Sequence, residues 1–159
     1  MAVEPYETAE AQSFPCVRQL SVFLENRVGQ LLRMTQILQN SGVRILSLSA
    51  VNAVDCAILR LLVDDTDEAR DILTQNGFAT SESEVVVVVL PEGRTALLTV
   101  CAALLQAEVN INYAYPLLTP MHGRPALAIQ LDNLQMGIKV LQSRDFEVLD
   151  ESDLVSGGQ

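Results

Sequence analysis

The stretch FATSESEVVVVVLPEGRTALL, residues 78–98, decides the fold, because the sequence that follows it repeats the pattern that precedes it. At an offset of 66 residues, seven apolar residues between positions 88 and 111 fall on identical residues of the first half. Past the middle of each copy the offset becomes 68, and four more pairs match: Leu59 with Leu127, Asp64 with Asp132, Leu73 with Leu141, and Phe78 with Phe146. A repeat of this length is long enough for a small domain with its own core. The chain is therefore two copies of one fold in tandem.

The first copy has the order strand, helix, strand, strand, helix, strand. Runs of β-forming residues predict strands at 17–24, 43–51, 56–63 and 78–82, with residues 52–55 as the turn of a hairpin. Apolar residues at helical spacing predict a helix over 30–40 and a second one that ends before Asn76 and Gly77. Asp65 and Glu68 are spaced as a capping box for the second helix.

The second copy repeats this order, with predicted strands at 85–90, 109–116, 126–131 and 146–149 and helices at 94–106 and 133–143. With right-handed crossovers, we expect an α+β protein of two ferredoxin-like βαββαβ domains, each a four-stranded antiparallel sheet with two helices on one face. The expected boundaries are a disordered tail at 1–14, domains at 15–82 and 83–150, and a C-terminal tail at 151–159. Residues 150–159 are expected to fray.

The five consecutive valines at 85–89 have no polar side, and a strand that is apolar on both faces is normally buried on both. The helix-free face of the second copy must therefore be covered. Either the two sheets of one chain pack together or a second chain supplies the cover. We expect a homodimer.

Composition excludes several classes of function. Ten Lys and Arg against 20 Asp and Glu give a net charge of -10, which repels nucleic acid and anionic membranes. No apolar run is long enough to cross a bilayer, and the N-terminus lacks a signal-peptide pattern, so we expect a cytoplasmic protein. The three cysteines, Cys16, Cys56 and Cys101, are widely spaced and accompany a single histidine, which indicates buried thiols and no metal site.

The loop ENRVGQL, residues 25–31, joins the first strand to the first helix. A glycine just ahead of a helix lets unpaired backbone N–H groups approach a ligand, and the helix dipole favours an anion such as a carboxylate. Taken alone, the loop is more often explained by turn geometry.

The chain resembles the ACT domain family over nearly all of residues 17–149. The resemblance rests on three features: the tandem βαββαβ order of elements, ENRVGQL in the first turn, and GVRI at the start of the next strand. A similar ENRPG stretch forms the serine site in the regulatory domain of phosphoglycerate dehydrogenase. Val28 stands where the family usually has proline, while Gly29 is kept. In the second copy the Pro-Gly pair has become Arg94-Thr95, so its loop approaches a ligand less closely, and Arg44 in the first copy occupies the position of Asn110.

In ACT proteins a ligand characteristically lies between two domains, touched by the turn of one and the second strand of the other. The resemblance implies one composite ligand site. Its residues are Asn26, Val28, Gly29, Gln30 and Leu31 of the first copy and Asn110 of the second. The backbone N–H groups of residues 28–31 would hold a carboxylate, and an Asn26 or Asn110 amide oxygen would accept from the ammonium group.

Other candidate residues have simpler interpretations. His122 lies in a predicted turn without an associated nucleophile, and Asp64, Asp65 and Asp67 fit helix capping better than magnesium binding. Tyr113 and Tyr115 share one strand face with apolar residues, so core packing is favoured over the wall of a ligand pocket. Arg94 either pairs with a ligand carboxylate or lies in solvent.

We therefore expect an amino-acid-binding regulatory protein that binds a small amino acid between ACT domains and modulates a partner allosterically. The alternative in the same family is a free-standing regulatory subunit of a biosynthetic enzyme, resembling the small subunit of acetolactate synthase. No nucleophile and base pair, metal cluster or phosphate loop is present in the sequence, so we expect neither an enzyme nor a cofactor.

Overall fold

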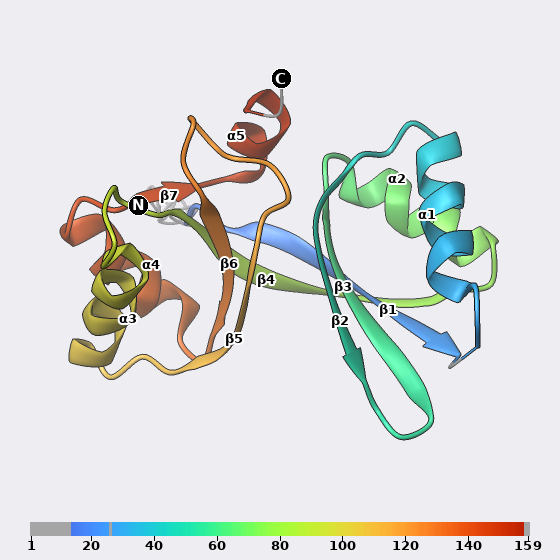
Figure 1. Ribbon diagram of the computed structural model, residues 1–159, viewed down its shortest axis with the longest axis horizontal. Coiled ribbons are helices and arrows are strands. Elements are labelled where there is room, and N and C mark those ends of the chain that lie inside the picture. The colour runs from blue at the N-terminus through green and yellow to red at the C-terminus, as the bar shows by residue number, and fades with distance from the viewer. Residues whose placement is uncertain (1–13, 26, 158–159) are drawn as a thin grey trace, which may run out of the picture.

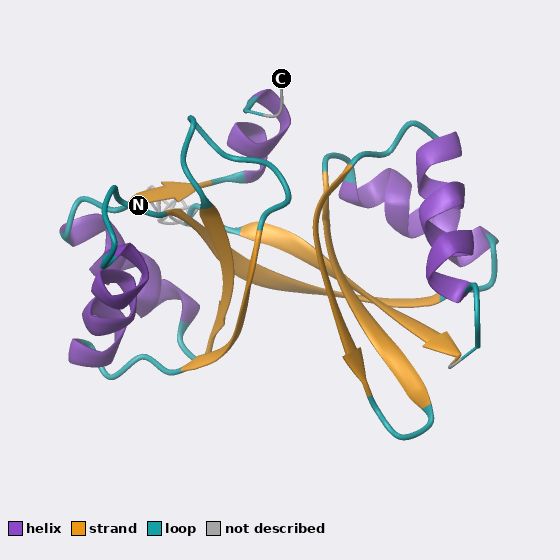
Figure 2. Cartoon of the chain, viewed as in Figure 1, coloured by secondary structure: helices purple, strands orange, loops and turns teal. Residues whose placement is uncertain are grey.

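The structure contains the two predicted βαββαβ units, one after the other along the chain (Figures 1 and 2). The computed structural model describes residues 14–25 and 27–157. Unit one contains β1 (Val17–Glu25), α1 (Gln30–Asn40), β2 (Ile45–Asn52), β3 (Cys56–Val63), α2 (Thr66–Gln75) and the first half of β4 (Ala79–Val89). Unit two contains the second half of β4, α3 (Ala96–Gln106), β5 (Ile111–Pro116), β6 (Ala126–Leu131), α4 (Leu134–Ser143) and β7 (Glu147–Leu149). The last element is α5 (Glu151–Ser156).

The long strand β4 belongs to both units. Its first half pairs with β1, from Ala79 opposite Phe23 to Val85 opposite Val17, and its second half pairs with β6 and β7. The prediction of two separate strands, at 78–82 and 85–90, is wrong, because no glycine or proline interrupts the run between them. Each unit keeps four antiparallel strands, in the orders β2-β3-β1-β4 and β5-β6-β4-β7, within one continuous sheet.

Two strands begin two residues later than predicted, for a local reason. The strands β2 and β5 begin at Ile45 and Ile111, because the N–H groups of Val43 and Val109 are hydrogen bonded to carbonyls at the ends of α1 and α3. The predictions for α1, β3 and β6 match the structure residue for residue. At the start of α2, the Asp65 side chain accepts a hydrogen bond from the Glu68 N–H at 3.0 Å, which is one half of the predicted capping box.

The helices α1 to α4 lie on the outer sides of the molecule, and the helix-free faces of the two units turn toward each other (Figures 1 and 2). Each unit has a core between its helices and its sheet. In unit one, Leu20, Leu38 and Leu61 belong to this core, and in unit two, Leu104 and Ile138. A third cluster fills the space between the helix-free faces.

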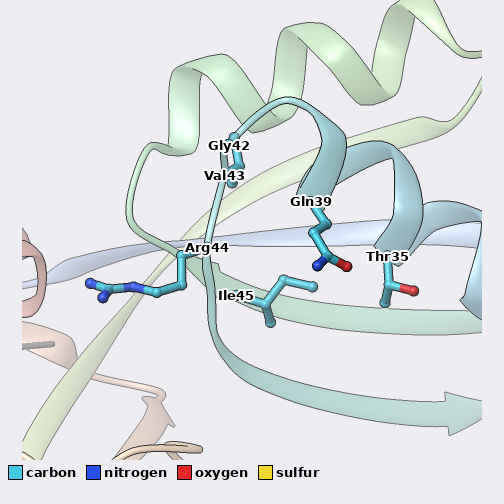
Figure 3. A pocket seen from close by; sticks show the side chains of 6 residues that line it. All are labelled: Thr35, Gln39, Gly42, Val43, Arg44 and Ile45. Carbon is cyan, nitrogen blue, oxygen red and sulfur yellow. The ribbon is translucent and has the colours of Figure 1, made fainter. Parts of the chain in front are cut away.

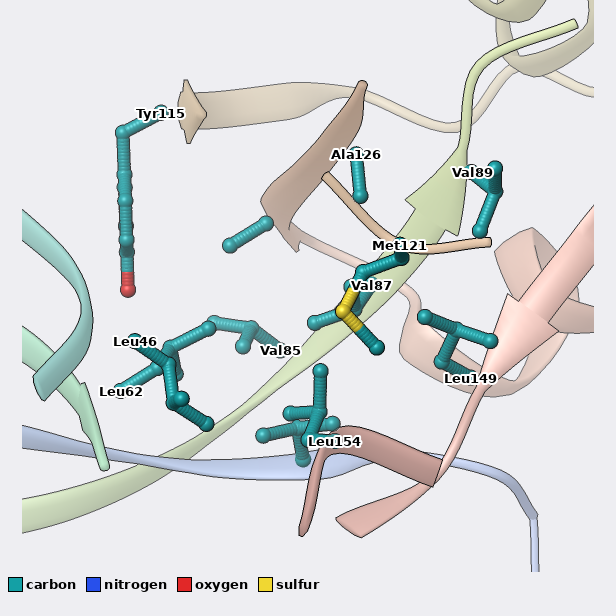
Figure 4. Close-up of a cluster of buried hydrophobic side chains, with 12 residues drawn as sticks. Leu46, Leu62, Val85, Val87, Val89, Tyr115, Met121, Ala126, Leu149 and Leu154 are labelled. Atoms are coloured by element: carbon teal, nitrogen blue, oxygen red, sulfur yellow. The ribbon is translucent and has the colours of Figure 1, made fainter. Parts of the chain in front are cut away.

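The valine run is covered on both of its faces by this chain. Val86 and Val88 pack in the core under α3 and α4, whereas Val85, Val87 and Val89 belong to the third cluster (Figure 4). The residues that cover them come from unit one, from the loop between β5 and β6, and from α5; they include Leu46, Leu62, Met121 and Leu154. Of the two alternatives for the cover, packing within one chain is therefore the one observed. A homodimer remains a prediction.

A polar contact also crosses the space between the units. The Gln19 side chain, which is fully buried, donates hydrogen bonds to the hydroxyls of Ser83 at 3.0 Å and Tyr113 at 2.8 Å. The Tyr115 hydroxyl donates to the Gln19 Oε1 at 2.5 Å, and burial raises the pKa of the Tyr115 phenol, which keeps it protonated. The Arg60 guanidinium lies 3.7 Å from the centre of the Tyr113 ring. Tyr113 and Tyr115 therefore pack between the units, as the core interpretation predicted.

The expectation that residues 150–159 fray is wrong for residues 151–156, which form α5. Asp150 and Asp153 form a capping box at its start, and Leu154 is only 1% exposed. Glu151 accepts hydrogen bonds from the Arg18 backbone N–H at 2.9 Å and from its Nε at 2.8 Å. A helix of six residues is unstable by itself, so these tertiary contacts hold it against the sheet.

Candidate functional site

The turn between β1 and α1 has the backbone geometry that a ligand site for an anion requires. Gly29 is the N-cap of α1 with φ 87°, a left-handed conformation that residues with a Cβ rarely adopt. No side chain in the described part of the chain caps this helix, and the N–H groups of Leu31 and Leu32 have no acceptor there. These N–H groups and the helix dipole favour an anion at this end of α1.

Two small cavities lie beside this turn. The apolar cavity, about 180 Å³, lies between the first turn of α1 and the ends of β1, β2 and β3, and its lining includes Leu24, Leu31 and Leu59. The charged cavity, about 200 Å³, has Arg27, Arg33 and Phe78 in its lining. Both cavities have Glu25, Arg27 and Gln30 in their lining.

The charged groups beside the turn already have partners within unit one. The Arg27 Nε lies 2.8 Å from a Glu25 carboxylate oxygen in an exposed ion pair. Arg33 donates a hydrogen bond to the Asn76 carbonyl at 3.2 Å, and its guanidinium lies 4.9 Å from the centre of the Phe78 ring. Both ion pair and hydrogen bond are exposed, so a ligand anion competes with them at little energetic cost.

Asn110 lies at the start of the second unit's central hairpin, just before β5. Its backbone N–H donates to the Asp132 carboxylate at 2.9 Å, and its Nδ2 donates to the Asn112 Oδ1 at 3.1 Å. Arg44 has the matching position in unit one, where its N–H donates to the Asp64 carboxylate at 2.8 Å. The repeat seen in the sequence is therefore also a repeat of backbone contacts.

The structure does not bring the two parts of the predicted composite site together within one chain. Val28, Gly29, Gln30 and Leu31 belong to the turn before α1 and to the first turn of that helix, whereas Asn110 directly precedes β5. The start of α1 and the start of β5 lie well apart, in different units (Figure 1). Both cavities beside the turn are lined by residues of unit one alone in the part of the chain described. The remaining predicted residue, Asn26, lies outside the described residues.

The equivalent turn of unit two has a different shape. Thr95, which matches Gly29 at the offset of 66, is the N-cap of α3, with φ -100° and no capping hydrogen bond from its side chain. The left-handed glycine is Gly93, two residues earlier, with φ 110°. The backbone that leads into α3 therefore differs from the one that leads into α1. The weaker ligand approach expected at this loop stays a prediction.

Sequence reasoning missed the residues that make room for the apolar cavity. Ala50 on β2 and Ala57 on β3 lie in its floor, and the hairpin that carries them was predicted only as a structural element. One signal was available: at the repeat offsets, these two alanines match Pro116 and Pro125 of the second copy. Small residues at positions where the other copy has larger ones indicate a space that only one copy keeps.

Larger cavities lie elsewhere on the surface. One, of about 420 Å³, lies between α1 and the start of β2, where the side chains of Gln39 and Thr35 extend beside Ile45 and that of Arg44 extends away from them (Figure 3). Another, of about 450 Å³, lies beside the start of α5 and is lined in part by Cys16 and Arg18. Burial raises the pKa of the Cys16 thiol, which disfavours its reactive thiolate form.

His122 and Asp67 have structural partners. His122 contacts Glu147, which also pairs with Arg124. Asp67 pairs with Arg18 at 2.8 Å, and the hydrogen bond from that guanidinium lowers the pKa of the Asp67 carboxyl. Within residues 14–25 and 27–157, no helix has both the length and the apolar character needed to cross a membrane.

Comparison with known proteins identifies a family. A sequence profile of the ACT domain pair matches residues 15–156. The crystal structure of protein BT0572 from Bacteroides thetaiotaomicron is similar, with a TM-score of 0.82 and 31% identity, covering 89% of this chain and 97% of that one. No curated protein sequence matches this chain.

More distant structures share the fold. The ligand-free regulatory subunit of aspartate kinase from Thermus thermophilus has a TM-score of 0.58 and 14% identity, covering 82% of this chain and 92% of that one. Aspartate kinase from Synechocystis has a TM-score of 0.55 and 15% identity, covering 89% of this chain and 26% of that one. At these identities the similarity concerns architecture, and a fold of this kind hosts more than one function.

Proposed function

We propose, from the premise that this chain belongs to the family of ACT domain pairs, that it is a regulatory protein that binds a small amino acid and modulates a partner. The observation that carries the proposal is the turn before α1. Gly29 exposes backbone N–H groups at the positive end of a helix, and two cavities lie beside it. A zwitterionic ligand offers the anion that this geometry favours.

The site is completed by a second chain. The Gly29 turn and Asn110 lie in different units and do not meet within the chain, so a site that uses both requires the turn of one protomer and the second strand of its partner (Figure 1). The outer surface of α3 supports such an association, because Leu97, Leu98 and Leu105 are exposed there and the helix carries no charge. In a chain with a net charge of -10, an uncharged apolar face is where two copies approach with least repulsion.

The ligand can regulate the partner if it binds one arrangement of the two protomers more tightly than another. A ligand shifts such an equilibrium only through this difference in affinity. The effect on the partner therefore depends on ligand-linked dimer geometry, and no chemical step in this chain is needed.

A thermal-shift screen with the 20 amino acids tests the proposal. A ligand at 100 times its dissociation constant adds about 2.7 kcal/mol of stability, which raises the Tm of a chain of this size by about 5–11 °C. Gly29→Val should abolish the shift, and Thr95→Val, at the matching position of unit two, should leave it unchanged. If none of the 20 amino acids raises the Tm, the proposed function is wrong.

Mixing two inactive variants tests the second chain's contribution. Gly29→Val retains Asn110, and Asn110→Ala retains the turn, so a mixed dimer has one intact site and one that is doubly damaged. Binding should return to half of the sites per mixed dimer when the purified variants are mixed. No return of binding would show that the two parts do not act across protomers.

A further inference from the structure

The apolar cavity beside the Gly29 turn is built from small and apolar side chains of three adjacent strands. Leu24 of β1 lies opposite Ala57 of β3, and Leu59 of β3 lies opposite Ala50 of β2, so these four side chains form two neighbouring rows of the sheet. The first turn of α1 forms the wall through Leu31. The cavity exists because the hairpin of β2 and β3 carries alanines at the level where α1 begins.

Unit two carries proline at both of the equivalent positions. Ala50 pairs with Leu59, and Pro116 pairs with Leu127, so Ala50 and Pro116 are equivalent in register as well as in sequence. At the offset of 68, Ala57 matches Pro125. The two copies therefore differ in side-chain volume at this place, and the room is retained beside the turn that has the left-handed glycine.

The size of the cavity limits its occupant. Its volume is about 180 Å³, and a water molecule takes about 30 Å³ of liquid volume. If a carbon with its hydrogens takes about the same volume, about six such groups fit. An aliphatic side chain of three or four carbons therefore fits, whereas the roughly nine heavy atoms of an indole ring do not.

The chemistry of the lining limits the occupant further. The floor and the α1 wall consist of apolar side chains, and a charged group placed against them loses hydration; these side chains are Leu24, Ala50, Ala57, Leu59 and Leu31. The polar lining residues are Arg27 and Gln30 at the turn and the start of α1, Glu25 at the end of β1, and Asn52 at the end of β2. The cavity is therefore apolar on its floor and on the α1 wall, and polar around the turn and the adjacent strand ends.

The cavity is continuous with the proposed carboxylate site. Leu31 lines the cavity with its side chain and presents its backbone N–H at the start of α1. An amino acid whose carboxylate accepts from this N–H has its α-carbon beside the cavity mouth. We propose that the ligand is an amino acid with an aliphatic side chain of three or four carbons, and that this side chain occupies the apolar cavity. This inference rests on the function proposed above.

Titration calorimetry of the full chain with alanine, 2-aminobutyrate, valine, leucine, serine, lysine and tryptophan tests the inference. Each added methylene group that becomes buried should tighten binding about fourfold, so affinity should rise from alanine to leucine. Serine should bind no better than alanine, and lysine and tryptophan should bind at least tenfold more weakly than leucine.

Cavity-filling variants separate the pocket from the turn. Ala50→Val should weaken leucine binding at least tenfold and change alanine binding less than threefold, because valine takes volume only from the ligand side chain. Ala57→Val gives a second test should the first variant fold poorly. Ala114→Val, at an exposed alanine of β5, is the matched control and should leave both affinities unchanged.

The outcomes distinguish this inference from the proposed function. Tight binding of serine or lysine, or unchanged leucine affinity in both Ala50→Val and Ala57→Val, overturns the assignment of the cavity while amino-acid binding stands. If no member of the series binds, the proposed function fails and the inference fails with it.

Discussion

The hydrogen bonds of Gln19 give the sharpest test of how the two units are held together. Gln19→Met keeps an unbranched side chain of similar length and removes all three contacts of the amide with Ser83, Tyr113 and Tyr115. The Tyr115 hydroxyl is then left without its acceptor while the residue is only 5% exposed. Ser83 and Tyr113 are less buried and regain hydration more easily.

The expected loss of stability follows from these burials. A buried polar group without a partner costs about 1–3 kcal/mol, and each lost hydrogen bond that water replaces costs about 1 kcal/mol or less. Gln19→Met should therefore destabilise the protein by about 2–4 kcal/mol, which lowers the Tm of a chain of this size by about 4–16 °C. Gln130→Met, at a less buried glutamine of β6, is the control and should stay within about 0.5 kcal/mol.

Replacing the whole network tests the reasoning itself. In the triple variant Gln19→Met, Tyr113→Phe and Tyr115→Phe, no polar group of these three side chains remains to be satisfied, and the Tyr113 ring under Arg60 is kept. The triple variant should recover at least half of the stability that Gln19→Met alone loses, as measured by urea unfolding. If the triple variant is less stable than the single one, the loss does not come from unsatisfied hydroxyls and the explanation fails.

Two further predictions concern the end of the chain and its acid sensitivity. Leu154→Ala removes the buried side chain that holds α5 and should lower the free energy of unfolding by about 2–5 kcal/mol, measured by thermal unfolding. Val155→Ala, at the half-exposed neighbour, should lower it by less than about 1 kcal/mol. Equal losses in the two variants would mean that α5 is not docked. The Arg18 guanidinium lowers the pKa of Asp67 below its ordinary value of 3.8. The ionised Asp67 carboxylate therefore stabilises the folded state fully above about pH 4, and this stabilisation is lost as the pH falls. Asp67→Asn should therefore lose less stability than the parent between pH 5 and 3, and identical pH profiles would contradict this assignment.

Most of the elements could be predicted from the sequence because their signals are local. The stop at Asn40 to Gly42, the hairpin turn before Cys56 and the cap at Asp65 act through backbone geometry within a few residues, and they appear where expected. The wrong prediction of two strands in place of β4 was also local in origin. The run from Ala79 to Val89 contains no residue that ends a strand, and its continuity should have been expected.

The candidate site was predicted in part. The Gly29 turn has the left-handed backbone that its sequence indicates, but the apolar cavity beside it depends on β1, β2, β3 and α1 meeting at one level. Ala50 and Ala57 give no signal within their own strands, because an alanine in a strand is common. The larger residues at the matching positions of the second copy indicate a difference in size, and the neighbours in space show that the alanines leave room.

The sequence by itself determined that this chain is a duplicated βαββαβ module, because hydrophobic period, turn residues and the repeat are properties of neighbouring residues and of their order. Only the tertiary structure decided which faces meet. The valines at 85–89 would be buried equally well by a second chain, by the other sheet or by the chain's own end, and the pattern is the same in each case. The choice among them depends on side chains far apart in sequence, such as Leu46, Met121 and Leu154, fitting together in one cluster.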